Sequence, residues 1–201
     1  KAALDAGVSS VVIGIGGSAT NDGGAGMAEA LGVRFLDSAG KPVGRGGAEL
    51  LNLTLIDLEQ KDERLDNVEV LVACDVQNTL CGREGASAVY GPQKGATLSD
   101  VSVLDKALEH FGRSIESQMN IDVLSLPGGG AAGGLGAGLV AFCGGTLMRG
   151  IDLTLRVTKF EERLRESDLV ITGEGKIDRQ LQYGKALSGV MERARKFTVP
   201  V

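Results

Sequence analysis

Three short apolar runs, each leading into polar or glycine-rich sequence, constrain the fold of this chain more than any other feature. They span residues 11–15, 70–74 and 169–172 and are rich in β-branched residues without polar alternation. Such runs are typical of strands that are buried on both faces, as in a parallel sheet. We therefore predict a mostly parallel sheet with ligand-binding loops at the carboxyl ends of its strands.

A strongly periodic helix is predicted between the second and third runs. Apolar residues recur at helical spacing from about Ser99 to Met119, and Thr97-x-x-Asp100 before them is typical of a capping box. The alternation of buried strands with such helices indicates the α/β class, in a three-layer-like arrangement with mostly parallel strands and glycine-rich loops. The lone histidine, His110, falls well away from the apolar stripe, so we expect it on the surface and any acid or base to be a carboxylate.

Composition and charge argue against several classes of function. The chain has 201 residues, 43% of them hydrophobic, and can bury one large core or two small ones. Its net charge is −5 and its 21 Lys and Arg are scattered, which argues against a nucleic-acid or an anionic-membrane surface. The three cysteines match no zinc spacing and no signal peptide opens the sequence, which favours a cytoplasmic protein.

One uncharged stretch, residues 125–148, has the length of a membrane span. Nine of its 24 residues are glycine, which leaves too little apolar side chain for insertion. We expect Gly128 to Gly138 to let a helix pack closely on its neighbours, with the first glycines free to face a ligand. A second phosphate cradle is the alternative.

The sequence GIGGSATNDGG at residues 14–24 resembles a dinucleotide-binding fingerprint. Gly14-x-Gly16-x-x-Ala19 matches that pattern, and Asp37 stands where a ribose-binding acid is expected. However, the Thr-Asn-Asp-Gly-Gly sequence that follows favours turns, so a helix can begin only near Ala25, later than that fold requires. A dinucleotide-binding, Rossmann-like protein is therefore the second hypothesis.

The same loop can also be a general anion cradle. Glycine exposes backbone N–H groups, Ser18 and Thr20 add hydroxyls, and a helix N-terminus follows. A purely structural turn explains the glycines as well, and a non-catalytic scaffold whose loops bind nothing is the third hypothesis.

Five motifs are similar, in wording and order, to those of one enzyme family. They are GIGGSATNDGGAGM at residues 14–27, ACDVQNTL at 73–80, YGPQKGA at 90–96, GGGAAGGLGAGL at 128–139 and DLVITGEGKIDRQ at 168–180, with Gly184-Lys185 beyond them. Along essentially all 201 residues the chain resembles the bacterial glycerate kinase family, of the glycerate 2-kinase type.

The resemblance implies a function and a domain organisation. The family transfers the γ-phosphate of ATP to D-glycerate, so ATP, Mg²⁺ and D-glycerate are the expected ligands, and a homo-oligomer is compatible with it. Its members have a flavodoxin-like domain made from both chain ends and a second α/β domain in between. Residues 1–201 would be the middle portion, mainly the second α/β domain, with both ends running into the flavodoxin-like domain. Such a fragment alone is expected to be inactive, because a kinase must hold both substrates at once.

Residues suited to phosphoryl transfer follow from this resemblance. The reaction needs two anions positioned and their charge neutralised, and one carboxylate to accept a hydroxyl proton. We predict Asp75 and Asp178 as catalytic residues and as candidate Mg²⁺ ligands. The residues expected to bind phosphate or substrate are Gly16, Gly17, Ser18, Thr20, Asn21, Asp22, Gly23, Gly24, Asn78, Lys94, Glu174 and Lys185. Each has a structural alternative, because an Asp after a strand commonly caps a turn and a loop lysine is commonly solvated.

The chain departs from the family pattern at two prolines. It has Asn78-Thr79-Leu80 where the family usually has Asn-Pro-Leu, and Lys185-Ala186-Leu187 where the family has Lys-x-Pro. Proline fixes its own backbone angle, so we expect both loops to be less rigid here.

Overall fold

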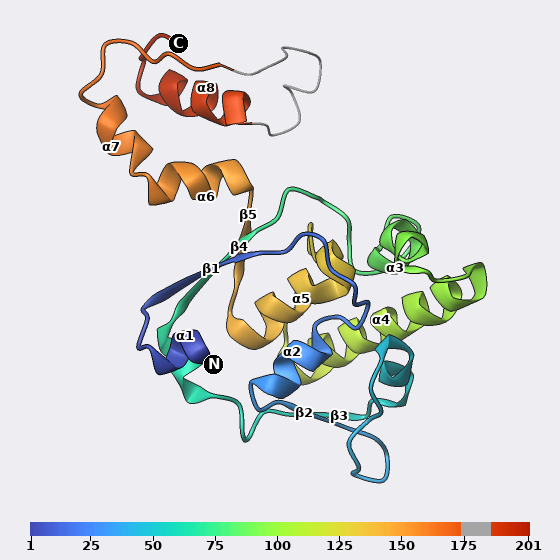
Figure 1. The fold of residues 1–201 in the computed structure, drawn as a ribbon. Coiled ribbons are helices and arrows are strands. Elements are labelled where there is room, and N and C mark those ends of the chain that lie inside the picture. The colour runs from blue at the N-terminus through green and yellow to red at the C-terminus, as the bar shows by residue number, and fades with distance from the viewer. Residues whose placement is uncertain (174–185) are drawn as a thin grey trace. The chain divides into compact units, whose positions relative to one another are not determined.

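The structure is a computed structural model of the chain, and it describes residues 1–173 and 186–201. The chain divides into two compact units, Lys1–Leu147 and Met148–Val201. Figure 1 shows the elements of each unit. None of the helices in the described residues combines the length and the apolar character that a membrane span requires.

The first two apolar runs form two neighbouring parallel strands of the first unit, as predicted. β1 (Ser10–Gly14) and β4 (Glu69–Ala73) pair in parallel, and β5 (Thr146–Met148) lies on the other side of β4. Gly14 is opposite Ala73 in the register, so both strands end at the same edge of the sheet. β4 is buried as expected. β1 is not, since it is an edge strand of this sheet and Val12 is 52% exposed.

The third predicted strand, residues 169–172, is not formed, and this prediction was wrong. Val170 N donates one backbone hydrogen bond to Pro200 O, at 2.9 Å. A β-ladder needs a series of such bonds between neighbouring strands. Ile171 is 89% exposed, so the run is not buried either. An apolar, β-branched composition therefore does not make a strand where no neighbouring strand pairs with it.

The other elements of the first unit are helices and a small antiparallel ribbon. In chain order they are α1 (Ala2–Asp5), α2 (Ala25–Ala30), β2 (Arg34–Leu36), η1 (Gly47–Asn52), β3 (Leu55–Asp57), η2 (Glu63–Asn67), α3 (Ala86–Tyr90), η3 (Pro92–Lys94), α4 (Leu98–Met119) and α5 (Ala131–Cys143). α5 contacts β4 and also α2, α3 and α4, so it connects the sheet with the helices (Figure 1). The fold is mixed α/β with a parallel sheet, as predicted.

The long helix α4 matches its prediction, including its first turn. Thr97 accepts a hydrogen bond from Asp100 N, while the Asp100 carboxylate accepts one from Thr97 N, which completes the capping box. His110 differs from the prediction. Its Nε2 atom lies 2.8 Å from Leu53 O and the residue is half-buried, because the segment after η1 covers this flank of the helix. The apolar stripe of a helix is calculated from that helix alone, so it cannot predict that another segment will cover His110.

Three phenylalanines form the centre of the core in the first unit. The rings of Phe35, Phe111 and Phe142 are fully buried, and their centroids lie 5.5–6.0 Å apart. Two of the three pairs are edge-to-face, a favoured geometry for aromatic rings. Through Phe111 and Phe142 this cluster joins α4 and α5, the two helices beneath the glycine loop.

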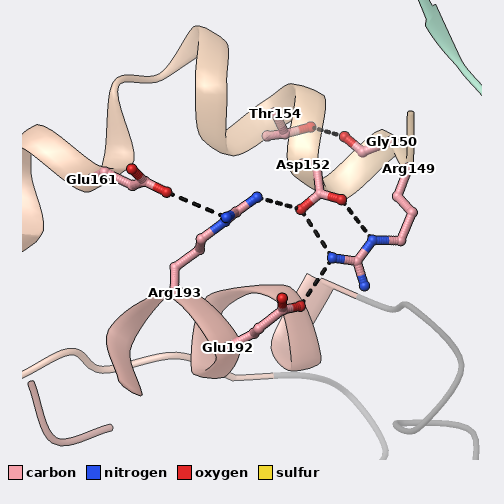
Figure 2. Close-up of polar contacts among 7 residues, drawn as sticks. All are labelled: Arg149, Gly150, Asp152, Thr154, Glu161, Glu192 and Arg193. Atoms are coloured by element: carbon pink, nitrogen blue, oxygen red, sulfur yellow. Dashed lines mark hydrogen bonds and ion pairs between the residues drawn. The ribbon is translucent and has the colours of Figure 1, made fainter. Parts of the chain in front are cut away.

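The helices in the described residues of the second unit are α6 (Gly150–Val157), α7 (Phe160–Leu164) and α8 (Ala186–Lys196). Figure 2 shows a network of ion pairs that connects them. Asp152 of α6 accepts hydrogen bonds from Arg149 Nε at 2.6 Å and from Arg193 Nη2 at 2.9 Å. Arg149 also binds Glu192 of α8, and Arg193 lies 3.4 Å from Glu161 of α7. Asp152 and two arginines therefore join α6, α7 and α8.

Candidate functional site

Two of the predicted loops begin together at the carboxyl edge of the sheet. The glycine loop, residues 15–24, follows β1, and the loop of residues 74–80 follows β4. The glycine loop has no regular structure, and α2 begins at Ala25, as the turn-favouring sequence predicted. The convergence expected of parallel strands is thus confirmed for these two loops.

The structure does not have the features of a dinucleotide-binding fold at this loop. The helix begins after the fingerprint instead of inside it. β2 lies in a separate antiparallel ribbon with β3, whereas a Rossmann fold would place it in the parallel sheet. Asp37 accepts hydrogen bonds from Ala39 N and Lys41 N and so holds a turn.

The glycine loop has an open half and a packed half. Side-chain atoms added at Gly16 or Gly17 would meet nothing within 4 Å, so the backbone here borders open space. At Gly23 a Cβ would lie 2.6 Å from the ring of Phe111, and at Gly24 it would lie 3.2 Å from Leu135. Gly17, Gly23 and Gly24 all have positive φ angles, 65°, 64° and 80°, which favour glycine, so the two pairs differ in their packing. The second glycine pair therefore serves the turn and the packing, and only the first pair borders space that a ligand can occupy.

Asp22 holds the turn that leads into α2. Its two carboxylate oxygens accept hydrogen bonds from Gly24 N and Gly26 N, each at 3.1 Å. This is the structural role that an Asn-Asp-Gly-Gly sequence predicts for its aspartate.

Lys94, at the end of η3, holds the open half of the glycine loop. Its Nζ atom donates to Ser18 Oγ at 2.9 Å and to Thr20 O at 2.6 Å. Burial lowers the pKa of the Lys94 ammonium group, and the negative charge of Asp22 acts in the opposite direction. An ammonium group has three N–H donors, so one remains beyond these two hydrogen bonds. A cation is thus placed beside the exposed glycine backbone.

Asn21, in the middle of the loop, is held by the neighbouring helix α3. Its Nδ2 atom donates to the hydroxyl of Ser87 at 2.9 Å, and Ser87 is fully buried. Within the described part of the chain, Asn21 Oδ1 is the one buried side-chain oxygen or nitrogen without a hydrogen-bond partner. Such an atom is rare in folded proteins, because burying it unpaired costs free energy.

The loop after β4 carries Asp75, which is exposed, and Asn78, whose side chain is engaged within the protein. Asn78 Nδ2 donates to Glu84 O at 2.7 Å, and its Oδ1 accepts from the Tyr90 hydroxyl at 2.7 Å. The Thr79 hydroxyl donates to Cys81 O at 3.1 Å. These hydrogen bonds are contacts that the loop makes where the family's proline is absent, and its lower rigidity stays a prediction.

Residues 128–138 pack directly against the glycine loop, as the sequence favoured. Gly23 N donates to Gly133 O at 3.0 Å, and a Cβ on Gly134 would lie 2.7 Å from Gly23 Cα. A Cβ on Gly138 would overlap the carbonyl oxygen of Gly23. Ala132, Gly133 and Gly134 have left-handed backbone angles, so the regular helix starts after them. The small residues of this segment allow two backbones to touch.

Three predicted site residues, Glu174, Asp178 and Lys185, lie outside the described residues. Among residues 1–173 and 186–201, no three His, Cys, Asp or Glu side chains come together in a way that could hold a metal ion. All three cysteines lie in these ranges and are free thiols, and burial raises the pKa of each.

Sequence reasoning missed two residues of this region, Ser87 and Tyr90. Ser87 and Tyr90 are spaced i and i+3, which places both side chains on one face of α3, and Lys94 follows four residues later in η3. A polar stripe in a short helix beside a glycine loop was the available signal.

Comparison with known proteins adds independent findings. The model of the glycerate kinase family matches residues 1–201. A glycerate kinase of Halalkalibacterium halodurans is 53% identical over 99% of this chain and 52% of its own length. The glycerate 2-kinase of Escherichia coli is 47% identical, also over 99% of this chain and 52% of its own length. A crystal structure of a glycerate kinase 2 from Salmonella typhimurium LT2 has a TM-score of 0.88 and 52% identity, covering 100% of this chain and 53% of that one. The chain therefore spans about half the length of the relatives that it matches.

Proposed function

The chain belongs to the glycerate kinase family, and on this premise we propose that the whole protein transfers the γ-phosphoryl group of ATP to D-glycerate. The relatives' names support a kinase acting on glycerate, and the ATP dependence and the D configuration are part of the proposal. Magnesium and a cytoplasmic location stay predictions as well.

One observation carries the proposal in the structure: the half-buried Lys94 lies beside the open half of the glycine loop. Lys94 contacts Ser18 and Thr20, and the backbone at Gly16 and Gly17 borders open space. Backbone N–H groups together with one cation suit a phosphate or carboxylate group, and both substrates are anions. Lys94, Ser18 and the N–H groups of Gly16 and Gly17 therefore bind anionic oxygens in this proposal.

Asp75 is the proposed general base. It follows β4 directly at the edge where the glycine loop begins, and it is exposed. Its carboxylate accepts the proton of the glycerate hydroxyl while that oxygen attacks the γ-phosphorus and ADP leaves. Asp75 is also the residue that we propose as a ligand of Mg²⁺, which commonly takes one or two carboxylates together with phosphate oxygens and water. The ion would supply positive charge to offset that of the phosphate oxygens.

A coupled assay of ADP release tests this function. The whole protein is incubated with ATP and Mg²⁺, with D-glycerate in one series and L-glycerate, lactate or glycolate in parallel series. We expect turnover that depends on D-glycerate and saturates with it. Folded protein that releases no ADP above background with any of these acids would remove the kinase proposal. A polypeptide of residues 1–201 alone is proposed to be inactive in the same assay.

A further inference from the structure

The open half of the glycine loop, residues 16–20, presents hydrogen-bond donors that the protein itself does not use. Gly16, Gly17, Ala19 and Thr20 are exposed, and Ser18 is half-buried. Within the described part of the chain, none of the backbone N–H groups of residues 16–20 donates a hydrogen bond. Backbone N–H groups without an acceptor in the protein are free to bind water or a ligand.

Lys94 adds a positive charge to this half of the loop. Its Nζ atom donates to Ser18 Oγ and Thr20 O, which are both neutral oxygens. Among residues 1–173 and 186–201, no carboxylate forms an ion pair with it. The nearby Asp22 carboxylate instead accepts hydrogen bonds from two backbone N–H groups at the beginning of α2. A half-buried ammonium group without an ion-pair partner is suited to an anionic ligand.

The side chains of the open half offer few acceptors to a ligand. None of residues 16–20 carries a carboxylate or an amide, and the amide oxygen of Asn21, the next residue, is buried. Glycerate has hydroxyl groups that donate hydrogen bonds, so its site needs acceptors as well as donors. The phosphate chain of ATP, in contrast, consists of acceptors. The balance of donors and acceptors therefore favours the phosphate chain.

We propose that the open half of the glycine loop, together with Lys94, binds the phosphate chain of ATP and not the carboxylate of glycerate. This assignment rests on the proposed kinase function and decides which of the two anionic substrates the loop receives. The phosphate oxygens accept hydrogen bonds from the loop N–H groups, from the hydroxyls of Ser18 and Thr20 and from the remaining N–H of Lys94. Glycerate then binds to other residues of the whole protein.

Gly16→Ala tests this assignment without a clash inside the protein. Gly16 has no left-handed backbone angle, and a Cβ added there meets nothing within 4 Å, so the variant should unfold at the wild-type temperature. Its methyl group instead occupies space proposed for a phosphate group. In titration calorimetry of the whole protein with Mg²⁺ and the β,γ-imido analogue of ATP, we expect Kd to rise about tenfold. Gly26→Ala, the same change at an exposed position of α2, should leave this Kd unchanged.

Lys94→Gln is the second variant, and it removes the positive charge. We expect Kd for the ATP analogue to rise about tenfold or more, the scale of one hydrogen bond to a charged group. The loss should grow from AMP to ADP to the ATP analogue, because each added phosphate brings further oxygens to the loop. In the coupled assay at saturating ATP, the KM for D-glycerate should change less than about twofold. Lys106→Gln, at an exposed lysine of α4, is the matched control and should change none of these constants.

The results separate this assignment from the proposed kinase function. If the KM for D-glycerate rises as much as Kd for the nucleotide, or rises alone, the assignment is overturned because the loop then holds the hydroxy acid. Unchanged constants for both substrates overturn it as well, and so does an equal loss for AMP and for the ATP analogue. If nucleotide binding depends on Lys94 in a folded wild-type background that phosphorylates no acid, the kinase proposal fails and the assignment of the loop to the nucleotide stands.

Discussion

Asp75 is the residue whose side chain the proposed chemistry needs most. Asp75→Asn in the whole protein keeps the shape of the side chain and removes its charge. We expect kcat to fall by about a hundredfold or more, the scale of losing a general base. Steady-state kinetics over a range of Mg²⁺ concentrations measures the effect.

The matched control for this substitution is Asp66→Asn. Asp66 is an exposed carboxylate that pairs with Lys61 at 2.8 Å, outside the candidate site, so its neutralisation should leave kcat unchanged. If Asp75→Asn turns over at a near-normal rate, Asp75 serves only its turn, and Asp178→Asn becomes the variant to measure.

The glycines show what the sequence could and could not predict at this scale. Two Gly-Gly pairs, Gly16-Gly17 and Gly23-Gly24, look equivalent in sequence, and both were predicted to bind phosphate. Only the partners supplied by α4 and α5, Phe111 and Leu135, distinguish the packed pair from the open one. Those partners come from residues about ninety or more positions away, and no local pattern contains them.

Among the elements, α5 packs its glycines against the glycine loop. Gly138→Ala tests this contact, because Ala is normally preferred over Gly inside a helix by up to about 1 kcal/mol. Here the added Cβ overlaps Gly23 O, so we expect the free energy of unfolding to fall by about 2–3 kcal/mol instead. Urea denaturation followed by circular dichroism measures the difference.

Gly26→Ala in α2 is the control for that substitution. Its Cβ would approach only the end of the Asp22 side chain, at 3.3 Å, so unfolding free energy should stay within about 0.5 kcal/mol of the wild type. A Gly138→Ala protein at least as stable as the wild type would show that the close approach of these backbones is not required.

The helices and strands also show which sequence patterns were sufficient to predict secondary structure. α4 was predicted almost to the residue, because its stripe and its capping box are local signals that agree with each other. Residues 169–172 were predicted as a strand from composition alone, but strand formation depends on a partner strand that composition does not contain. The place of the two loops at the sheet edge could be predicted from the pattern that also predicts β4. An apolar run that ends in polar residues marks the carboxyl end of a buried strand, and ligand-binding loops follow such ends.

The ion-pair network of the second unit joins α6, α7 and α8 and gives a prediction that depends on pH. Hydrogen bonds and charge from Arg149, and then Arg193, hold the pKa of Asp152 below its ordinary value of 3.8. Stabilisation from the carboxylate is therefore fully present above about pH 4, and it is lost as the pH falls through the lower folded-state pKa. Asp152→Asn should speed amide exchange in α8 about fivefold at pH 7, the equivalent of about 1 kcal/mol.

Two comparisons make this prediction specific. Glu162→Gln removes an exposed carboxylate of the same unit, 3.9 Å from Lys159, and should leave exchange in α8 unchanged. Amides of α4, in the first unit, should not respond to either substitution. If the amides of α8 exchange at the same rate in Asp152→Asn and in the wild type at pH 7, the ion pairs in Figure 2 do not stabilise this helix.

At the scale of the whole molecule, the chain belongs to the glycerate kinase family and spans about half the length of the relatives that it matches. The described residues supply one proposed anion-binding loop with its lysine and one proposed base, all in the first unit. Resemblance across five motifs is sufficient to predict the family from the sequence, because the motifs are long and keep their order. The division of the 201 residues into two units was not predicted, since no proline-rich or serine-rich linker marks the boundary at residue 147.

Phosphorus NMR of the reaction tests the central claim most directly, since it follows the phosphoryl group itself. The whole protein is mixed with ATP, Mg²⁺ and D-glycerate, and the γ-phosphate signal of ATP is followed together with any new phosphoester signal. The account predicts that one phosphoglycerate forms for each ATP consumed, with ADP as the other product. Consumption of ATP to give only inorganic phosphate, or no consumption by folded protein, would contradict the assignment of this protein as a glycerate kinase.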